Sequence, residues 1–249
     1  MKDIHSQNGG AEMPDHVRRS REKSFAIPGH ETRYSDSPLV EQIGHICAER
    51  EYAPLCPADG HWNMLFVRYH GETSLSVWGP MTKAATMPYA EGAEFLYITF
   101  TLGTFMPQMP VGNLLDKGSF LPLATSTSFW LDDASWQFPD YEHVDTFVDR
   151  LVRKGLLMHE PAVDAALQAQ PQTMSLRSTQ RRFLRATGLT LRSLQSIERA
   201  QHAAALLQQG VSLLDTVEEA GYFDQPHLNR ALKRFIGQTP TQIAQMGKP

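Results

Sequence analysis

QRRFLRATGLT, residues 180–190, recurs 49 residues later in the chain as NRALKRFIGQT, residues 229–239. The two copies share arginines, one apolar position, a glycine and a threonine at the same spacing: Arg181 and Arg230, Phe183 and Leu232, Arg185 and Arg234, Gly188 and Gly237, Thr190 and Thr239. Each copy therefore predicts a basic amphipathic helix that is closed by a glycine. Repetition of such a unit indicates one physical task performed twice, and two basic helices suit adjacent turns of a DNA major groove.

The charge of the chain is divided unevenly. Its 249 residues carry a net charge of −4 and are 41% hydrophobic, enough for two ordinary domains with their own cores. Residues 174–249 hold ten Lys and Arg against five Asp and Glu, whereas residues 1–173 hold thirteen against twenty-two. A basic module joined to an acidic one is typical of a polyanion-binding domain attached to a domain that does not bind polyanions.

The cysteines and the hydropathy indicate a cytoplasmic protein without a membrane segment. Only Cys47 and Cys56 occur, and the chain has no CxxC motif, no signal-peptide pattern and no apolar run near the ~20 residues of a membrane helix. Both cysteines are expected to be free, since a free cysteine is mostly a small buried hydrophobe. A redox pair between them is the less favoured alternative.

The composition divides the chain into three parts. Residues 1–36 are polar and predict a mobile tail, in which the basic cluster at 18–21 is expected to be solvated rather than bound to phosphate. Residues 37–157 hold short strand-like runs separated by Gly, Pro and Asp, at 39–46 (strand or helix), 63–69, 74–78 and 94–101. This pattern predicts a small β-barrel or sandwich, and hence an α+β protein in which a β domain precedes an all-α domain at 158–249.

The period of the apolar positions changes to that of a helix after Tyr141. Val144, Phe147, Val148, Leu151 and Val152 share one stripe, and Gly155 ends this helix. The stripe is expected to pack on the β domain, with a dimer seam as the alternative. A second helix is expected at 162–169, between Pro161 and Pro171.

The first basic unit carries side chains suited to reading DNA. Ser175 is expected to cap a helix over 176–187, with Phe183 on its buried side and its N-terminus free to accept a phosphate. Arg177, Gln180 and Arg181 lie three and four residues apart, so they share one face, and their groups recognise base edges in the major groove. The remaining polar positions predicted to contact phosphates are Ser175, Arg182 and Arg185.

The second unit has the layout of a helix-turn-helix. Ser212 caps a helix over 213–220, Gly221 supplies the turn, and Asp224 caps a second helix over 225–235. Gln225, His227, Asn229 and Arg230 are the predicted base-reading residues, and Lys233 and Arg234 the predicted phosphate contacts. A helix at about 191–209 is expected to join the two units. The alternative is a helical bundle with a solvated basic face, which the duplication disfavours.

These stretches resemble the AraC/XylS family of transcriptional regulators. The resemblance rests on TGLT at 187–190, IERAQ at 197–201, GYFDQPHLNR at 221–230 and GQTP at 237–240, and covers about residues 160–246. It implies two helix-turn-helix units joined by a linker helix, two recognition helices in successive major grooves, and the base-reading positions named above. The chain departs from the family pattern at Thr179, at Thr216-Val217, and at Pro171 in the segment before Ser175.

The N-terminal half more weakly resembles the β sensor domains that precede this module in some family members. PADGH at 57–61, WGP at 78–80 and YITF at 97–100 carry this resemblance, which implies a cupin-like barrel holding an effector. Aromatic and polar side chains at His61, Trp62, Trp78 and Tyr97 are the candidates for an effector pocket, although aromatic residues in strands are more often core.

Other chemistry finds little support in the sequence. His45, His61 and His70 invite a metal site, but no second ligand stands at a convincing spacing, so neither a metal nor another cofactor is expected. No P-loop, GxGxxG or GxSxG occurs, and no nucleophile accompanies Asp59 and His61.

The sequence thus predicts a non-enzymatic, sequence-specific DNA-binding transcriptional regulator. Its expected partners are double-stranded DNA, a small-molecule effector and RNA polymerase, and it is expected to act as a monomer or a homodimer. Two alternatives remain: a DNA-repair or small-molecule enzyme that uses the helical module for targeting, and a scaffold whose helical module meets an acidic protein.

Overall fold

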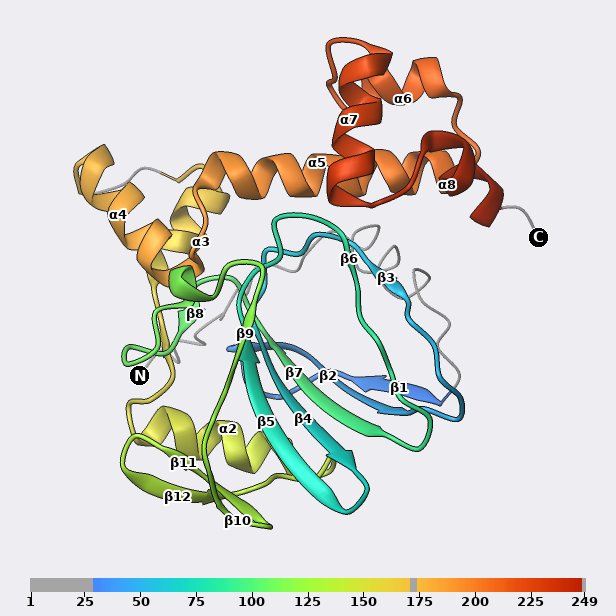
Figure 1. Cartoon of the computed structure of the whole chain (residues 1–249). Coiled ribbons are helices and arrows are strands. Elements are labelled where there is room, and N and C mark those ends of the chain that lie inside the picture. Colours follow the sequence, from blue (N-terminus) through green and yellow to red (C-terminus); the bar gives the residue numbers. More distant parts are fainter. Residues whose placement is uncertain (1–28, 171–173, 248–249) are drawn as a thin grey trace, which may run out of the picture.

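The computed structural model describes residues 29–170 and 174–247, shown in colour in Figure 1. Most of the predicted tail, including the basic cluster at 18–21, and Pro171 lie outside the described residues. The chain forms a β-rich N-terminal region followed by a helical C-terminal region, as the sequence predicts.

The β region is built on a six-stranded antiparallel sheet in the order β1-β2-β7-β4-β5-β9. Its strands are β1 (His30–Arg33), β2 (Val40–Cys47), β4 (Asn63–Tyr69), β5 (Glu72–Trp78), β7 (Glu94–Phe100) and β9 (Gly118–Phe120). Within the described part of the chain, the edge strands β1 and β9 do not pair with each other, so the sheet stays open and does not close into the predicted barrel. The sheet also begins earlier than predicted, because β1 lies within residues 1–36.

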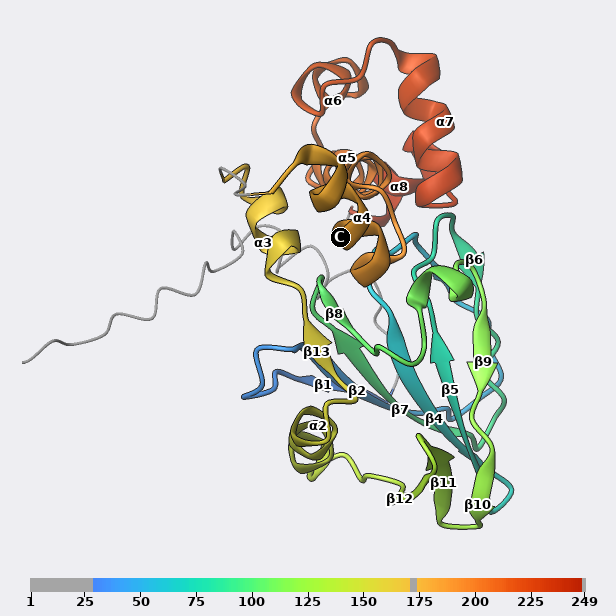
Figure 2. The same ribbon diagram turned by 90° about the vertical axis from the view of Figure 1, so that its left-hand side faces the viewer.

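One face of this sheet carries the largest core. Helix α2 (Val144–Arg153) and a three-stranded sheet, β10 (Leu123–Thr125), β11 (Ser128–Leu131) and β12 (Ala134–Gln137), cover that face (Figure 2). Four of the five predicted stripe residues of α2 are buried in this core, whereas Val152 is 39% exposed. The stripe of α2 therefore packs inside its own domain, as the favoured interpretation predicts.

The opposite face of the sheet holds a smaller cluster of tyrosines and aliphatic residues. The segments that contain β3 (Leu55–Cys56) and β6 (Ala85–Thr86) pair with each other and bring Tyr52 onto Tyr89, with ring centroids 4.8 Å apart. Phe95 and Tyr97 of β7 belong to this cluster, whereas Leu96, Ile98 and Phe100 point into the larger core. Strand β7 thus lies between two packed layers, which explains why both of its faces are apolar.

The β region reaches the helices through a few short elements. These are β8 (Thr104–Phe105), β13 (Met158–His159), which pairs with β8, and the 3₁₀ helix η1 (Val111–Leu114). The helices that follow are α3 (Pro161–Leu167), α4 (Leu176–Thr187), α5 (Leu191–Gln208), α6 (Leu213–Glu219), α7 (Gln225–Phe235) and α8 (Pro240–Met246). None of the helices in the described ranges has the length and apolar composition needed to cross a membrane.

Helix α5 joins two small helical groups, α3 with α4 on one side and α6, α7 and α8 on the other (Figure 1). Helix α5 carries an apolar stripe that is buried: Leu194 and Ile197 pack with Phe183 of α4, whereas Ala200, Ala204 and Leu207 pack with Leu228 and Leu232 of α7. One rigid helix therefore contributes to both cores and holds the two groups at a constant separation.

The β region docks against this helical region through the segment at 57–61. Ala58 is fully buried in the cluster around Phe183 and Leu194. Its backbone N–H donates a 2.6 Å hydrogen bond to the carbonyl oxygen of Phe235, and its own carbonyl oxygen accepts one of 2.9 Å from Nε2 of Gln201. The PADGH segment is therefore part of the contact between the two regions.

Candidate DNA-binding surface

Helix α4 forms where the sequence predicts it because both of its ends are specified locally. The Ser175 hydroxyl caps the helix by accepting a hydrogen bond from the N–H of Ser178, and Gly188 ends it with a φ of 72°, the left-handed conformation that favours glycine. Phe183 is 2% exposed and anchors the inner side of the helix. A helix fixed in this way presents its opposite face rigidly.

The exposed face of α4 carries the three predicted base-reading residues. Arg177, Gln180 and Arg181 are all exposed and share this face. Among residues 29–170 and 174–247, no hydrogen bond or ion pair occupies these three side chains. Their donors and acceptors are therefore free to meet an outside partner.

Helix α7 is built in the same way. The Asp224 carboxylate caps it by accepting a 2.7 Å hydrogen bond from the N–H of His227, and Pro226 occupies a first-turn position that needs no N–H donor. Leu228 and Leu232 are fully buried, and Gly237 follows the helix with a φ of 82°. The helix thus has one buried side and one exposed side.

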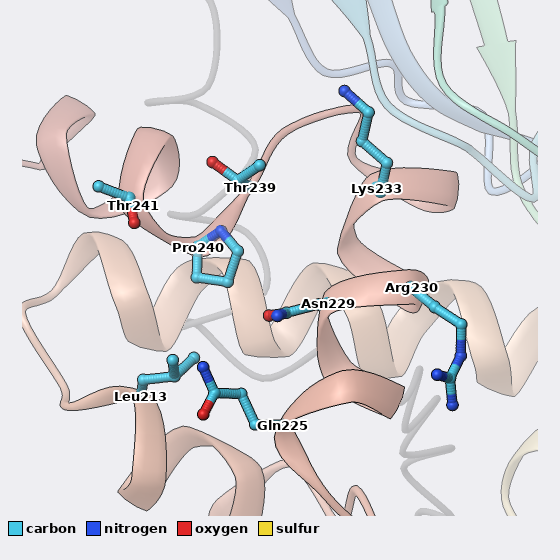
Figure 3. Close-up of a pocket in the computed structure, with 8 residues that line it drawn as sticks. All are labelled: Leu213, Gln225, Asn229, Arg230, Lys233, Thr239, Pro240 and Thr241. Atoms are coloured by element: carbon cyan, nitrogen blue, oxygen red, sulfur yellow. The ribbon is translucent and has the colours of Figure 1, made fainter.

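The exposed side of α7 borders an open hollow of about 410 Å³, which residues at the start of α6 and of α8 complete. Figure 3 shows the side chains that line it. Gln225, Asn229 and Arg230 line it, together with Lys233 and Thr239. Asn229 is only half exposed, and its Oδ1 is buried without a hydrogen-bond partner among the described residues. His227 lies outside the hollow, exposed, with its ring edge-on to Tyr222 at 5.1 Å.

The internal repeat is also a structural repeat. Positions 49 residues apart play the same part in both units: the N-caps Ser175 and Asp224, the buried Phe183 and Leu232, the left-handed Gly188 and Gly237, and the N-caps of the following helices, Thr190 and Thr239. The two basic helices therefore start and pack at equivalent positions, and a left-handed glycine follows each, although Gly188 is itself the C-cap of α4 whereas Ile236 is the C-cap of α7.

The residues predicted to contact phosphates lie in more varied surroundings. Arg182 pairs with Glu160 at 3.4 Å, and the Arg185 guanidinium lies 5.7 Å from the ring centre of Phe105 in β8. Arg234 lies over the ring of Phe235, and Nζ of Lys233 donates to the carbonyl oxygen of Gly237 at 3.4 Å. The structure thus turns Arg182 and Arg185 toward α3 and the β region, a placement that sequence reasoning missed.

Comparison with known families matches this helical region. The model of a helix-turn-helix domain covers residues 169–246, which include α4 to α8. Residues 169–246 form an AraC-type helix-turn-helix domain. Domains of this type belong to DNA-binding transcription regulators, and the exposed faces of α4 and α7 are accordingly the candidate DNA-binding surface of the AraC-type domain.

The other comparisons are weaker. No curated protein matches the sequence. Solved structures of ToxT from Vibrio cholerae match at low similarity. ToxT bound to (E)-4-(8-methylnaphthalen-1-yl)but-3-enoic acid is 9% identical over 88% of this chain and 100% of that chain, with a TM-score of 0.36. An apo ToxT variant is 8% identical over 87% and 100%, with a TM-score of 0.37.

The structure does not bring the four predicted effector-pocket residues together. Trp62 is buried on the α2 side of the sheet, where it stacks on Phe100, with ring centroids 4.0 Å apart. Tyr97 lies on the other side of the sheet, in the tyrosine cluster. Trp78 donates its Nε1–H to the Ser76 hydroxyl, and Gly118 lies against its ring. Because strand alternation does not reveal what covers each face, the sequence grouped side chains that belong to separate layers.

The remaining member of that set, His61, belongs to the docking segment. It is 6% exposed, and Oδ1 of Asp59 accepts a 3.1 Å hydrogen bond from its backbone N–H and lies 2.5 Å from its Nδ1. These contacts close the turn that holds Ala58 against the AraC-type domain. The Asp59–His61 pair thus has a structural task at the contact between the regions.

Proposed function

We propose that the chain is a sequence-specific DNA-binding transcriptional regulator that places α4 and α7 in successive major grooves. The observation that carries this proposal is the pair of exposed polar faces on two helices with equivalent caps and equivalent anchors. Helix α5, packed into both cores, fixes their spacing. The proposed base-reading residues are Arg177, Gln180, Arg181, Gln225, His227, Asn229 and Arg230.

The proposed mechanism has an electrostatic step and a readout step. The excess of Lys and Arg in residues 174–249 attracts the phosphate backbone, and the contacts proposed to set the register are Ser175, Arg182, Arg185, Lys233 and Arg234. Arginine then pairs with the major-groove edge of guanine, and glutamine or asparagine with that of adenine. One chain supplies both reading helices, so we propose that a monomer suffices for binding, in the cytoplasm of the cell.

We further propose that the β region modulates this binding, because it holds the C-terminal ends of both reading helices. A Cβ on Gly188, at the end of α4, would lie 3.0 Å from Cα of Gly112 in η1. A Cβ on the equivalent Gly237, after α7, would lie 2.8 Å from Cδ2 of Leu55 and 2.9 Å from Cβ of Ala84. A change in the β region would therefore alter the position of both helices at once.

We propose that the regulator is not an enzyme. The residues that most resembled half of an acid–base pair, Asp59 and His61, are engaged in the docking turn. An enzyme that uses the AraC-type domain only for targeting would need its reactive groups in the β region. Such an enzyme would turn over a substrate in the absence of DNA. The proposed regulator would instead bind one DNA sequence in preference to others.

Selection from a random duplex library tests the proposal with the whole purified chain at near-physiological salt. We expect one enriched motif with two elements about one helical turn apart. The variants Arg177→Ala and Arg230→Ala should each abolish the preference at a different element, whereas Arg153→Ala, which removes an exposed arginine at the end of α2, should leave both intact. Tight binding without an enriched motif would overturn the proposal and leave the domain a nonspecific tether.

A further inference from the structure

Three metal-ligating side chains meet at one end of the β sheet, outside the DNA-binding surface. They are His45 and Cys47 of β2 and Glu94, the first residue of β7. Nε2 of His45 lies 2.8 Å from Oε1 of Glu94 and 3.9 Å from Sγ of Cys47. All three ligand atoms lie within 4.8 Å of one another.

The sheet itself brings these groups together. His45 and Cys47 are two residues apart on one strand, so their side chains point to the same face. Glu94 stands directly opposite Cys47 in the antiparallel register of β2 and β7, which puts it on that face as well. Because all three residues lie on paired strands, the backbone holds the cluster ready for a ligand.

We propose that this cluster binds a divalent cation of the zinc class through Sγ of Cys47, Nε2 of His45 and Oε1 of Glu94. Tetrahedral zinc with bonds of about 2.0–2.3 Å separates its N and O ligands by roughly 3.3 Å and its S and N ligands by roughly 3.6 Å. The observed 2.8 and 3.9 Å lie within about 0.5 Å of these separations. Thiolate and imidazole select zinc-class ions over magnesium and calcium, which prefer oxygen.

The neighbours of the cluster support a bound cation. Arg68 donates to the other carboxylate oxygen of Glu94, Oε2, and thereby orients Oε1 toward His45. The His45 ring lies beside the ring of Tyr141, with centroids 5.6 Å apart. Of the charged groups that act on Cys47, the three carboxylates of Glu31, Glu49 and Glu94 outnumber the single guanidinium of Arg68. Their field favours a positive ion beside the sulfur.

The open side of the cluster leaves room for a fourth ligand. Cys47 is exposed, and Glu31 stands opposite His45 in the β1–β2 pair, on the same face. Three protein ligands with an open position resemble an exchangeable site more than a closed structural one. The sequence alone does not predict this site, because the 47-residue separation between Cys47 and Glu94 carries no information about the register of β2 and β7.

Titration of the metal-free whole chain with Co²⁺, and competition of Co²⁺ by Zn²⁺, tests the proposal without DNA. We expect one equivalent of Co²⁺ to bind and to produce a thiolate-to-cobalt charge-transfer band, which Zn²⁺ abolishes. Cys47→Ser should lose the band, and His45→Gln and Glu94→Gln should each weaken binding by more than about tenfold. Cys56→Ser, which changes the other cysteine, should behave as the wild type.

Two results would overturn the proposal. One is the absence of stoichiometric Co²⁺ or Zn²⁺ binding by a chain that has a cooperative thermal transition. The other is a charge-transfer band that survives in Cys47→Ser, which would place the metal on Cys56 or on another group. Because the readout is metal binding by itself, failure of this site leaves the proposed DNA binding untouched, and failure of sequence-specific DNA binding leaves the metal site untouched.

Discussion

The backbone N–H of Ala58 donates a 2.6 Å hydrogen bond to the carbonyl oxygen of Phe235, the last residue of α7. One residue earlier, the carbonyl oxygen of Arg234 accepts a 2.9 Å hydrogen bond from the N–H of Ala84. The last carbonyl groups of a helix have no partner inside the helix, so they bind water or a cap. Here the β region supplies the cap of α7, the second proposed reading helix, and separation of the two regions would release those carbonyls.

This docking predicts different outcomes for two glycine variants. Gly237→Ala and Gly221→Ala should each lose roughly 1–2 kcal/mol of unfolding free energy, because both glycines have positive φ, 82° and 66°. Only the Cβ at Gly237 meets the β region, whereas nothing lies within 4 Å of a Cβ at Gly221. Small-angle scattering should therefore show a larger radius of gyration for Gly237→Ala alone. Equal scattering from both variants would argue against docking of the β region on the end of α7.

The departure from the family pattern at Thr179 predicts a stabilising substitution. Thr179 is 6% exposed, and its hydroxyl has no hydrogen-bond partner among the described residues. Thr179→Val keeps the shape and removes that orphan group, so it should raise the unfolding free energy by about 1 kcal/mol. Thr216 provides the control: its hydroxyl donates a 2.8 Å hydrogen bond to the Ser212 carbonyl oxygen, and Thr216→Val should lose about 1 kcal/mol.

Urea unfolding of both variants measures this difference. Destabilisation by Thr179→Val would mean that its hydroxyl has a partner, and that the first unit is packed differently from this structure.

The proposed reading faces of α4 and α7 predict a loss of base discrimination when one arginine is removed. Arg181→Ala and Arg230→Ala should each cost about 1–3 kcal/mol on the preferred site and relax the base preference at one position. Arg153→Ala should change neither quantity, because Arg153 lies on α2. Competition binding with single-base variants of the selected motif measures both effects. An unchanged base preference in Arg181→Ala would show that α4 reads DNA with another face.

A phosphate contact predicts a different signature. Lys233 is exposed in the last turn of α7 and lines the hollow beside the proposed base-reading residues. Lys233→Gln should weaken binding to all sequences alike and lower the slope of log K against log salt by about 1. The same binding experiment over a series of salt concentrations gives the slope. Loss of affinity for the preferred motif alone would instead make Lys233 a base-reading residue.

The helical region could be predicted from the sequence because its signals are local. Ser175, Asp224 and Thr190 are caps that act on N–H groups within their own helix, and Gly188 and Gly237 mark where the basic helices end. The bounds of α4 and α7 agree with the prediction for that reason. The linker helix α5 can be predicted from its own apolar stripe alone, and that stripe is buried along the helix.

The β region was harder to predict because its contacts are distant along the chain. The polar edge strand β1 forms because it pairs with β2, and the sequence of His30–Arg33 alone does not predict that pairing. Trp62 and Tyr97 were grouped although they occupy opposite sides of the sheet. Cys47 and Glu94 meet only through the register of β2 and β7. Each of these features depends on which strands pair, and the local composition of a strand does not predict its partner.

The two cysteines should differ in reactivity because their surroundings differ. Burial raises the pKa of the Cys56 thiol from 9.0 to about 11, whereas Cys47 is exposed at the end of β2. The pKa of Cys47 is also raised, first by partial burial and then by neighbouring carboxylates, so its reaction should be slow rather than absent. At about pH 8 a disulfide reagent should therefore modify one thiol per folded chain.

Thiol counting on the single variants identifies which sulfur reacts, with a chelator present so that metal does not protect Cys47. Cys56→Ser should retain the reactive thiol and Cys47→Ser should lack it. Cys56 also makes the free energy of unfolding depend on pH. Above pH 9.0 the thiol ionises in the unfolded chain but stays protonated in the folded chain, so the free energy of unfolding falls as the pH rises. The contribution of Cys56 to stability is lost once the pH passes about 11. Faster reaction of Cys56 than of Cys47 in the folded chain would show that the segment around β3 opens to solvent.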